Sequence, residues 1–228
     1  ELKTGARQAH LDVLVHTAAV APGSADAFCA GLGEGVLGEL PWLLVQGVVL
    51  NRRQQLHAAA QILSRVTTEA RLQGDVELLL WALLELGRAR GMSGQMSRAN
   101  KSLREVLSIL DTASCSPQRY IALLGIGMLH TQEQAFETSL GFNLEALEAS
   151  RLAEDPQGVA HCLSNLGETY LRLNRPEEAE SCYRDAQALV DGTAWTRTQC
   201  MVLSGLGTLA FFQGDTDPCL LYTSPSPR

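Results

Sequence analysis

The sequence predicts an all-α protein made of antiparallel helical hairpins, because small and apolar residues recur along it at a fixed interval. Glycines stand 40 residues apart, at Gly47, Gly87, Gly127, Gly167 and Gly207. A leucine stands four residues before each of them, at Leu43, Leu83, Leu123, Leu163 and Leu203. The residue just before the glycine is apolar in every unit but the first. These positions share one face of an α-helix, so each unit is expected to begin with an amphipathic helix, called helix A.

A second set of residues predicts the partner of helix A. A glycine inside a helix costs about 1 kcal/mol relative to alanine, so its recurrence indicates that a neighbouring backbone needs the space. Three positions follow each glycine at helical spacing: first Ala59, Ala99, Ser139 and Ala179, then Leu63, Leu103, Asn143 and Tyr183, then Val66, Val106, Ala146 and Ala186. They predict a helix B, whose first, small residue is expected to fit against the glycine while the larger residues fill the space alongside.

Turn signals place the ends of these helices. Ser116-Pro117 and Asp155-Pro156 are typical of an N-cap followed by proline at the first helical position. Gly74 is typical of a helix end. The expected helices span 41–53, 54–73, 75–92, 95–112, 117–131, 133–153, 156–174, 176–190 and 194–213, and no β-strand is expected. The repeat units lie near 40–79, 80–119, 120–159, 160–199 and, incomplete, 200–218.

The fourth unit resembles the tetratricopeptide repeat family. The stretch Leu163-Ser-Asn-Leu-Gly-Glu-Thr-Tyr-Leu-Arg-Leu-Asn-Arg-Pro-Glu-Glu-Ala179, followed by Tyr183 and Ala186, carries the family's large, Leu-Gly, Tyr, Ala, aromatic and Ala positions in order. The resemblance covers about residues 41–213. It implies a right-handed superhelical solenoid whose A helices line a concave surface. The period is longer than the standard unit of about 34 residues; HEAT-type repeats run to about 40 residues but lack the glycine and alanine positions.

Composition and charge exclude several classes of function. The 228 residues are 46% hydrophobic and carry a formal net charge of −7. No run of basic residues is present that would neutralise a phosphate backbone or an anionic membrane surface, so we expect no direct nucleic-acid partner and no membrane binding. The sequence contains no apolar stretch long enough for a membrane span and no secretory signal, which predicts a cytoplasmic location.

Catalysis and metal binding find little support in the residue pattern. The six cysteines form no CxxC pair, so reduced and mostly buried thiols are the first interpretation. A metal site built from His161, Cys162, Cys182 and Cys200 is the alternative, although no two ligands stand one helical turn apart. The histidines occur singly, and His130 takes the place in the core stripe that Tyr170 takes one unit later. We therefore expect no catalytic residue, no metal and no cofactor.

The two ends of the chain do not follow the repeat pattern. Residues 1–40 form an uncertain N-terminal segment that is interpreted either as a degenerate hairpin or as a linker. A GxGxxG string at 33–38 lacks the strand before it and the helix after it that a dinucleotide site needs. Residues 219–228 match one reading frame of a common transposon-type sequencing adapter. We interpret them as a non-native tail and expect the natural chain to continue differently past Pro218.

The resemblance implies that function lies on the concave surface of the A helices. The groove candidates are Trp81, Leu84, Arg88, Ile121, Leu124, Met128, His161, Ser164, Asn165, Glu168, Arg172, Met201, Ser204 and Thr208. We expect them to hold a peptide or partner segment, as part of a larger bacterial signalling protein; simple packing against adjoining units is the structural alternative. The functional alternative is a small-ligand sensor region of a transcriptional or nucleotide-signalling regulator. The uncapped apolar side of 194–213 is expected to favour self-association.

Overall fold

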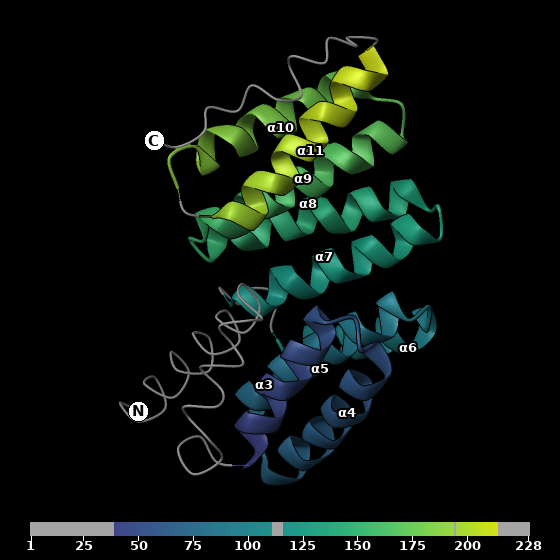
Figure 1. Ribbon diagram of the computed structural model, residues 1–228, viewed down its shortest axis with the longest axis vertical. Coiled ribbons are helices and arrows are strands. Elements are labelled where there is room, and N and C mark those ends of the chain that lie inside the picture. Colours follow the sequence, from purple (N-terminus) through teal and green to yellow (C-terminus); the bar gives the residue numbers. More distant parts are fainter. Residues whose placement is uncertain (1–38, 111–115, 194, 214–228) are drawn as a thin grey trace. The chain divides into compact units, whose positions relative to one another are not determined.

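The computed structural model describes residues 39–110, 116–193 and 195–213, and every regular element in these ranges is an α-helix (Figure 1). The helices are α3 (Glu39–Arg52), α4 (Leu56–Gln73), α5 (Val76–Met92), α6 (Met96–Ile109), α7 (Pro117–Gln132), α8 (Phe136–Leu152), α9 (Pro156–Arg172), α10 (Pro176–Val190) and α11 (Thr196–Gln213). The predicted all-α class is confirmed. The interpretations of residues 1–38, including the GxGxxG string, and of residues 219–228 lie outside the described residues.

The helices fall into two compact units, one with α3 to α6 and the other with α7 to α11. In each unit every helix packs against the next one along the chain. The helices that carry the glycines also contact one another, α3 with α5, α7 with α9, and α9 with α11. This pattern of hairpins, joined through their first helices, is the arrangement that the repeat predicted.

Most of the sequence signals at the helix ends act as predicted, although Ser116, at the N-cap position of α7, makes no side-chain cap hydrogen bond. Asp75 caps α5 by accepting a hydrogen bond from the backbone N–H of Leu78 at 3.2 Å. Asp155 caps α9 in the same way, accepting from the backbone N–H of Gly158 at 2.9 Å. Prolines begin α7, α9 and α10, where their missing N–H costs no helical hydrogen bond. Gly74 ends α4 in the left-handed conformation, with φ of 70°.

Two helix starts were predicted too early, at 54 and 133, because each A-to-B turn contains a left-handed residue. This residue is Gly94 in the α5–α6 hairpin, and it is Gln54, Gln134 and Asn174 in the other three hairpins. Their φ angles of 61°, 61° and 57° are incompatible with a continuing helix. The turns therefore delay the start of α4 to Leu56 and of α8 to Phe136.

The glycine positions do mark close approach, but the residue that fills them differs from the prediction. A Cβ added to Gly47 would lie 2.6 Å from Leu63, and one added to Gly87 would lie 2.8 Å from Leu103. Asn143 takes this place against Gly127, and Tyr183 against Gly167. The filler is thus the larger residue 16 positions after the glycine. The small residue 12 positions after it is buried and brings its backbone close, as the carbonyl of Ala99 shows at 3.6 Å from the added Cβ of Gly87.

Candidate functional site

In the α3–α6 unit, the predicted groove residues lie on α5 and are largely buried. Trp81 and Leu84 are both buried, while the side chain of Arg88 is about one-third exposed. Trp81 and Leu84 therefore fit the structural alternative, packing against neighbouring residues, better than they fit an open groove. Arg88 is the predicted residue of this unit that stays accessible.

A buried carboxylate lies next to Arg88. Glu85 is only 3% exposed, and the side-chain amide of Asn51 on α3 donates to its backbone oxygen and to its Oε2, both at 2.9 Å. The Arg88 guanidinium lies 3.7 Å from Glu85 Oε1. Asn51 is itself buried, and its Oδ1 accepts no hydrogen bond. This pair was not predicted from the sequence, although a lone glutamate in the apolar run Leu78–Leu86 was a signal for it.

In the α7–α11 unit, the predicted groove residues of α7 and α9 range from buried to exposed. Leu124 and Ser164 are buried, Ile121, His161 and Asn165 are intermediate, and Met128, Glu168 and Arg172 are exposed. The two helices that carry these residues, α7 and α9, contact each other. Glu168 and Arg172 form an exposed ion pair at 3.5 Å, and Asn165 donates to the backbone oxygen of His161 at 2.9 Å. The accessible residues of this set are thus the apolar Met128 on α7 and the oppositely charged Glu168 and Arg172 on α9.

A polar cluster joins α7, α8 and α9 beneath that face. The amide nitrogen of Asn143 donates to Thr169 Oγ1 at 2.9 Å and to Ser139 Oγ at 3.3 Å. The hydroxyls of Ser139 and Thr131 are 2.8 Å apart. Asn143 Oδ1 is buried without a hydrogen-bond partner. The departures from the repeat pattern at Ser139 and Asn143 thus make a buried network, where the α3–α6 unit has alanine and leucine.

The hydroxyl of Tyr120 and the thiols of Cys162 and Cys182 are held in their neutral forms. The Tyr120 hydroxyl donates to Asp155 Oδ2 at 2.7 Å, and burial together with the Asp155 charge raises the pKa of this tyrosine far above its ordinary range. Burial raises the pKa of the Cys162 thiol to about 12 and that of the Cys182 thiol to about 11. Because the thiolate is the reactive form, neither cysteine is activated as a nucleophile at neutral pH.

The proposed metal ligands do not converge. Cys162, Cys182 and Cys200 are free thiols that range from buried to exposed, and no group of three His, Cys, Asp or Glu side chains in the described ranges could hold a metal ion. His130 stacks on Phe142, with ring centroids 5.5 Å apart, and lies 3.5 Å from Glu133. Among the helices described, none is both long and apolar enough to cross a membrane.

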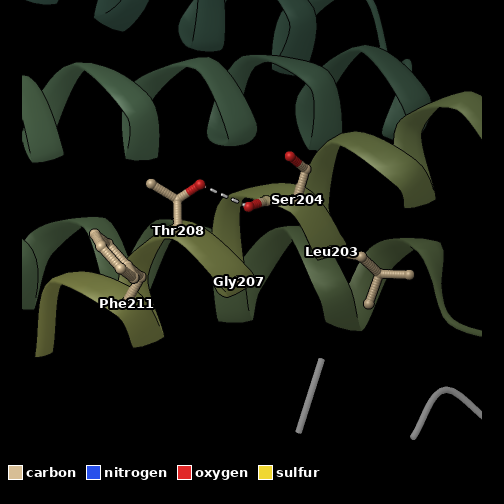
Figure 2. Close-up of a pocket in the computed structure, with 5 residues that line it drawn as sticks. All are labelled: Leu203, Ser204, Gly207, Thr208 and Phe211. Atoms are coloured by element: carbon tan, nitrogen blue, oxygen red, sulfur yellow. Dashed lines mark hydrogen bonds between the residues drawn. The ribbon is translucent and has the colours of Figure 1, made fainter. Parts of the chain in front are cut away.

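A shallow depression lies along α11 (Figure 2). Its volume is about 510 Å³, and its lining residues are Leu203, Ser204, Gly207, Thr208 and Phe211. These residues share one face of the helix by their spacing. Ser204 and Thr208 were predicted groove residues, and both are exposed; the third candidate on this helix, Met201, is intermediate.

Comparison with known proteins identifies a family and solved structures that resemble this arrangement of helices. Residues 118–191 match the profile of the tetratricopeptide repeat family. Among solved structures, BtubC (BKLC) from P. vanneervenii is similar with a TM-score of 0.65 and 19% identity, over 96% of this chain and 95% of that one. A Podosopora anserina protein described as a kinesin light chain with nearly identical TPR-like repeats is similar with a TM-score of 0.60 and 14% identity, over 78% and 88%. No curated protein matches the sequence.

These similarities agree with the packing of the hairpins. Tetratricopeptide repeats generally mediate contacts between proteins, and their fold is typically a scaffold without a catalytic role. The resemblance in the fourth unit and the family match overlap at the same residues, while the structural similarity covers nearly the whole chain. Residues 118–191 therefore match the tetratricopeptide repeat family, and the described helices have a tetratricopeptide-like fold.

Proposed function

We propose that this chain is a protein-interaction scaffold or regulatory repeat region that binds a peptide or partner segment on the A-helix face of α7 and α9. The observation that carries the proposal is the exposure of Met128 on α7 and of the ion pair Glu168 and Arg172 on α9, two helices that contact each other. The match to a family of interaction repeats supports it.

The chemistry of this face sets what the partner offers. Met128 has a flexible, polarizable side chain that adapts to varied apolar groups, and Ile121 lies two turns earlier on α7. The ion pair between Glu168 and Arg172 is exposed, so opening it costs little free energy and frees both charges for a partner. The expected partner is an amphipathic segment that places an apolar side chain on α7 and charged groups on α9.

Binding to this face is testable with peptides selected by phage display on the full chain. Met128→Ser is expected to weaken a selected amphipathic peptide about tenfold, since truncating a central apolar contact costs more than about 1 kcal/mol. The matched control is Leu144→Ser on α8, because Leu144 is 43% exposed and Met128 is 49% exposed in the same unit. Equal affinity in both variants, measured by fluorescence anisotropy, would place the peptide elsewhere and contradict the proposal.

The second candidate function is a small-ligand sensor, favoured by the polar cluster on α3 and α5. Asn51 Oδ1 is a buried acceptor without a hydrogen bond, and Glu85 and Arg88 lie beside it. A small molecule with an N–H or O–H donor would satisfy that oxygen. Thermal melting with a metabolite panel discriminates the two functions, because a ligand that binds only the folded state raises the melting temperature. Loss of such a shift in Asn51→Leu would assign it to this cluster.

The wider role is part of the same proposal. We place the chain in the cytoplasm as a non-catalytic region of a larger bacterial signalling protein, without direct contact to nucleic acid or membrane. Self-association through the exposed side of α11 belongs here as well. Analytical ultracentrifugation over a range of concentrations measures it directly, and a monomer at every concentration would remove it.

A further inference from the structure

The last turn of α5 carries a cation that has no acidic partner among the described residues. Arg90 is partly buried, and its Nη1 donates to Ser102 Oγ of α6 at 2.8 Å. Its Nη2 lies 3.5 Å from Ser64 Oγ of α4. Burial lowers the pKa of this guanidinium, and the nearby charge of Arg98 lowers it further. The charge of Arg90 is thus met by neutral hydroxyls and by a second cation.

Other arginines of the α3–α6 unit are paired with glutamates. The pairs are Arg65 with Glu39 and Glu69, Arg71 with Glu105, and Arg88 with Glu85. Two exposed cations of α6, Arg98 and Lys101, form no such pair with any residue that the structure describes, and Arg98 donates to the side-chain oxygen of Gln95 at 3.2 Å. Together with Arg90, they leave three positive charges without a carboxylate in one hairpin, although the chain has a net charge of −7.

The same place in the next two hairpins is filled by a ring. Arg90 stands three residues after the hairpin glycine, where the following units have His130 and Tyr170. The ring of His130 stacks on Phe142, which holds the place that Ser102 holds in α6. The α5–α6 hairpin thus has a guanidinium and a hydroxyl where its neighbour has two stacked rings. Packing of the hairpin does not require this exchange, because ring contacts fill the same space.

The two serine hydroxyls orient the Arg90 guanidinium. Ser102 donates to the backbone oxygen of Arg98 at 3.2 Å, and Ser64 donates to that of Ala60 at 2.6 Å, so both present lone pairs to Arg90. A guanidinium carries five N–H donors in a rigid plane, and the contacts with the serines use two of them. Arg98 lies one helical turn before Ser102, which places the second guanidinium on the same side of α6. The N–H groups that remain on both arginines are donors for an oxyanion.

We propose that Arg90 and Arg98, together with the hydroxyl of Ser102, form a binding site for a phosphoryl group. The two guanidinium charges match the charge of a phosphate ester, which approaches −2 at neutral pH, and their N–H groups pair with its oxygens. A carboxylate would match only one of the two charges. A bound dianion also offsets the repulsion between the two arginines, and Lys101 adds positive charge beside it. The site lies on α5 and α6 and is separate from the proposed face on α7 and α9.

Inorganic phosphate is the first probe. It is titrated into the isotope-labelled full chain at neutral pH and constant ionic strength, with chloride as the balancing anion. The amide NMR signals of residues at the site, such as Lys101 and Ser102, are expected to shift and to saturate with a single dissociation constant. Constant ionic strength removes the general effect of salt on exposed charges, so a saturable shift reports binding.

Variants of the full chain then locate the phosphate. Arg90→Leu and Arg98→Ala are each expected to weaken phosphate binding about tenfold, since each removes one charged partner of the anion. The matched control is Arg104→Ala, because Arg104 is also exposed on α6 and donates to a side-chain amide oxygen, that of Asn100 at 2.9 Å. It is expected to leave the dissociation constant unchanged. Because Arg98 is exposed, Arg98→Ala keeps the test valid even if Arg90→Leu does not fold.

A pair of peptides distinguishes the source of the phosphoryl group. A short, labelled, glycine-rich peptide with one phosphoserine and its unphosphorylated form are each titrated with the full chain and followed by fluorescence anisotropy. Binding of the phosphorylated form alone, weakened about tenfold in Arg98→Ala, assigns the site to a phosphorylated side chain of a partner. Binding of free phosphate without this preference assigns it to a small phosphorylated molecule. Met128→Ser is expected to change neither result, which separates this site from the proposed function.

Two results would overturn the proposal. The first is the same dissociation constant for phosphate in Arg90→Leu, Arg98→Ala and Arg104→Ala, because the anion would then respond to general positive charge or bind elsewhere. The second is a phosphate titration in which the amide signals around Ser102 do not shift or do not saturate, because the unpaired arginines would then hold no anion.

Discussion

The two units of this protein use the same backbone period with different side chains at the same places. In the α3–α6 unit, leucines fill the space above the glycines of helix A, at Leu63 and Leu103. In the α7–α11 unit, that space is filled by Asn143 and Tyr183, and hydrogen bonds cross between helices. The glycine thus specifies close approach, while the filler decides whether the hairpin is held by apolar packing or by a polar network.

Exchanging the fillers tests this difference with the largest expected effect. Leu103→Asn is expected to destabilise the α3–α6 unit by about 3–5 kcal/mol, because it removes a buried side chain and leaves an amide without partners. Asn143→Leu is expected to stabilise the α7–α11 unit by about 1 kcal/mol, since it removes the unsatisfied Oδ1. Hydrogen exchange resolved by helix measures both. If both substitutions destabilise equally, the polar network contributes more than its hydrogen bonds suggest.

The glycines themselves provide the next test. Gly87→Ala is expected to cost about 1–3 kcal/mol despite the better helix propensity of alanine, because the new Cβ would lie 2.8 Å from Leu103. The matched control is Gly141→Ala within α8, where nothing lies within 4 Å of an added Cβ. That substitution is expected to stabilise the protein by about 1 kcal/mol. The midpoint of urea unfolding gives both changes in stability. A stabilising Gly87→Ala would contradict the close contact between Gly87 and Leu103.

Alkaline pH is expected to destabilise the unit with α7 to α11 selectively. Its Cys162 thiol has a pKa of about 12 in the folded protein, above the ordinary value of 9.0. Stability from the neutral thiol is therefore complete below pH 9 and is lost as the pH rises towards 12. Between pH 8 and pH 10, Cys162→Ala is expected to lose about 1 kcal/mol less stability than the natural sequence. Equal losses in urea unfolding at the two pH values would contradict burial of the thiol.

The smallest expected effect concerns the A-to-B turns. Gln134 holds a left-handed φ of 61° at the position where Gly94 has 79° in the other unit. Gln134→Gly is expected to stabilise the protein by about 0.5–1 kcal/mol, and Gly94→Ala to destabilise it by about 1 kcal/mol. Thermal unfolding of the two variants measures the difference. A destabilising Gln134→Gly would mean that the flexibility of glycine in the unfolded chain outweighs the relief of strain.

Much of the fold was predictable from the sequence, because period and caps are local signals. The glycine interval located the four hairpins of the described residues, and Asp155-Pro156 fixed the start of α9 at the predicted residue. The turns at Gln54 and Gln134 escaped prediction, since glutamine carries no signal for a left-handed φ.

The candidate site was less predictable, because burial depends on what packs over a helix face. The spacing placed Trp81, Leu84 and Met128 at equivalent faces, yet only Met128 is exposed. The pair of Asn51 and Glu85 joins residues 34 positions apart, and no local pattern identifies such a contact. Conversely, the uncovered side of α11 follows from the same period that located the hairpins, since Leu203 and Phe211 occupy positions that are covered in α9.

The pairing of each glycine with a filler 16 residues later has a consequence for how such arrays change in length. Both members lie inside one hairpin, as Gly87 and Leu103 do in α5 and α6. A genetic duplication or deletion of one whole 40-residue segment carries the two together. Related proteins can therefore gain or lose a whole segment, whether leucine, asparagine or tyrosine fills the space above its glycine. No compensating second mutation at the glycine is needed.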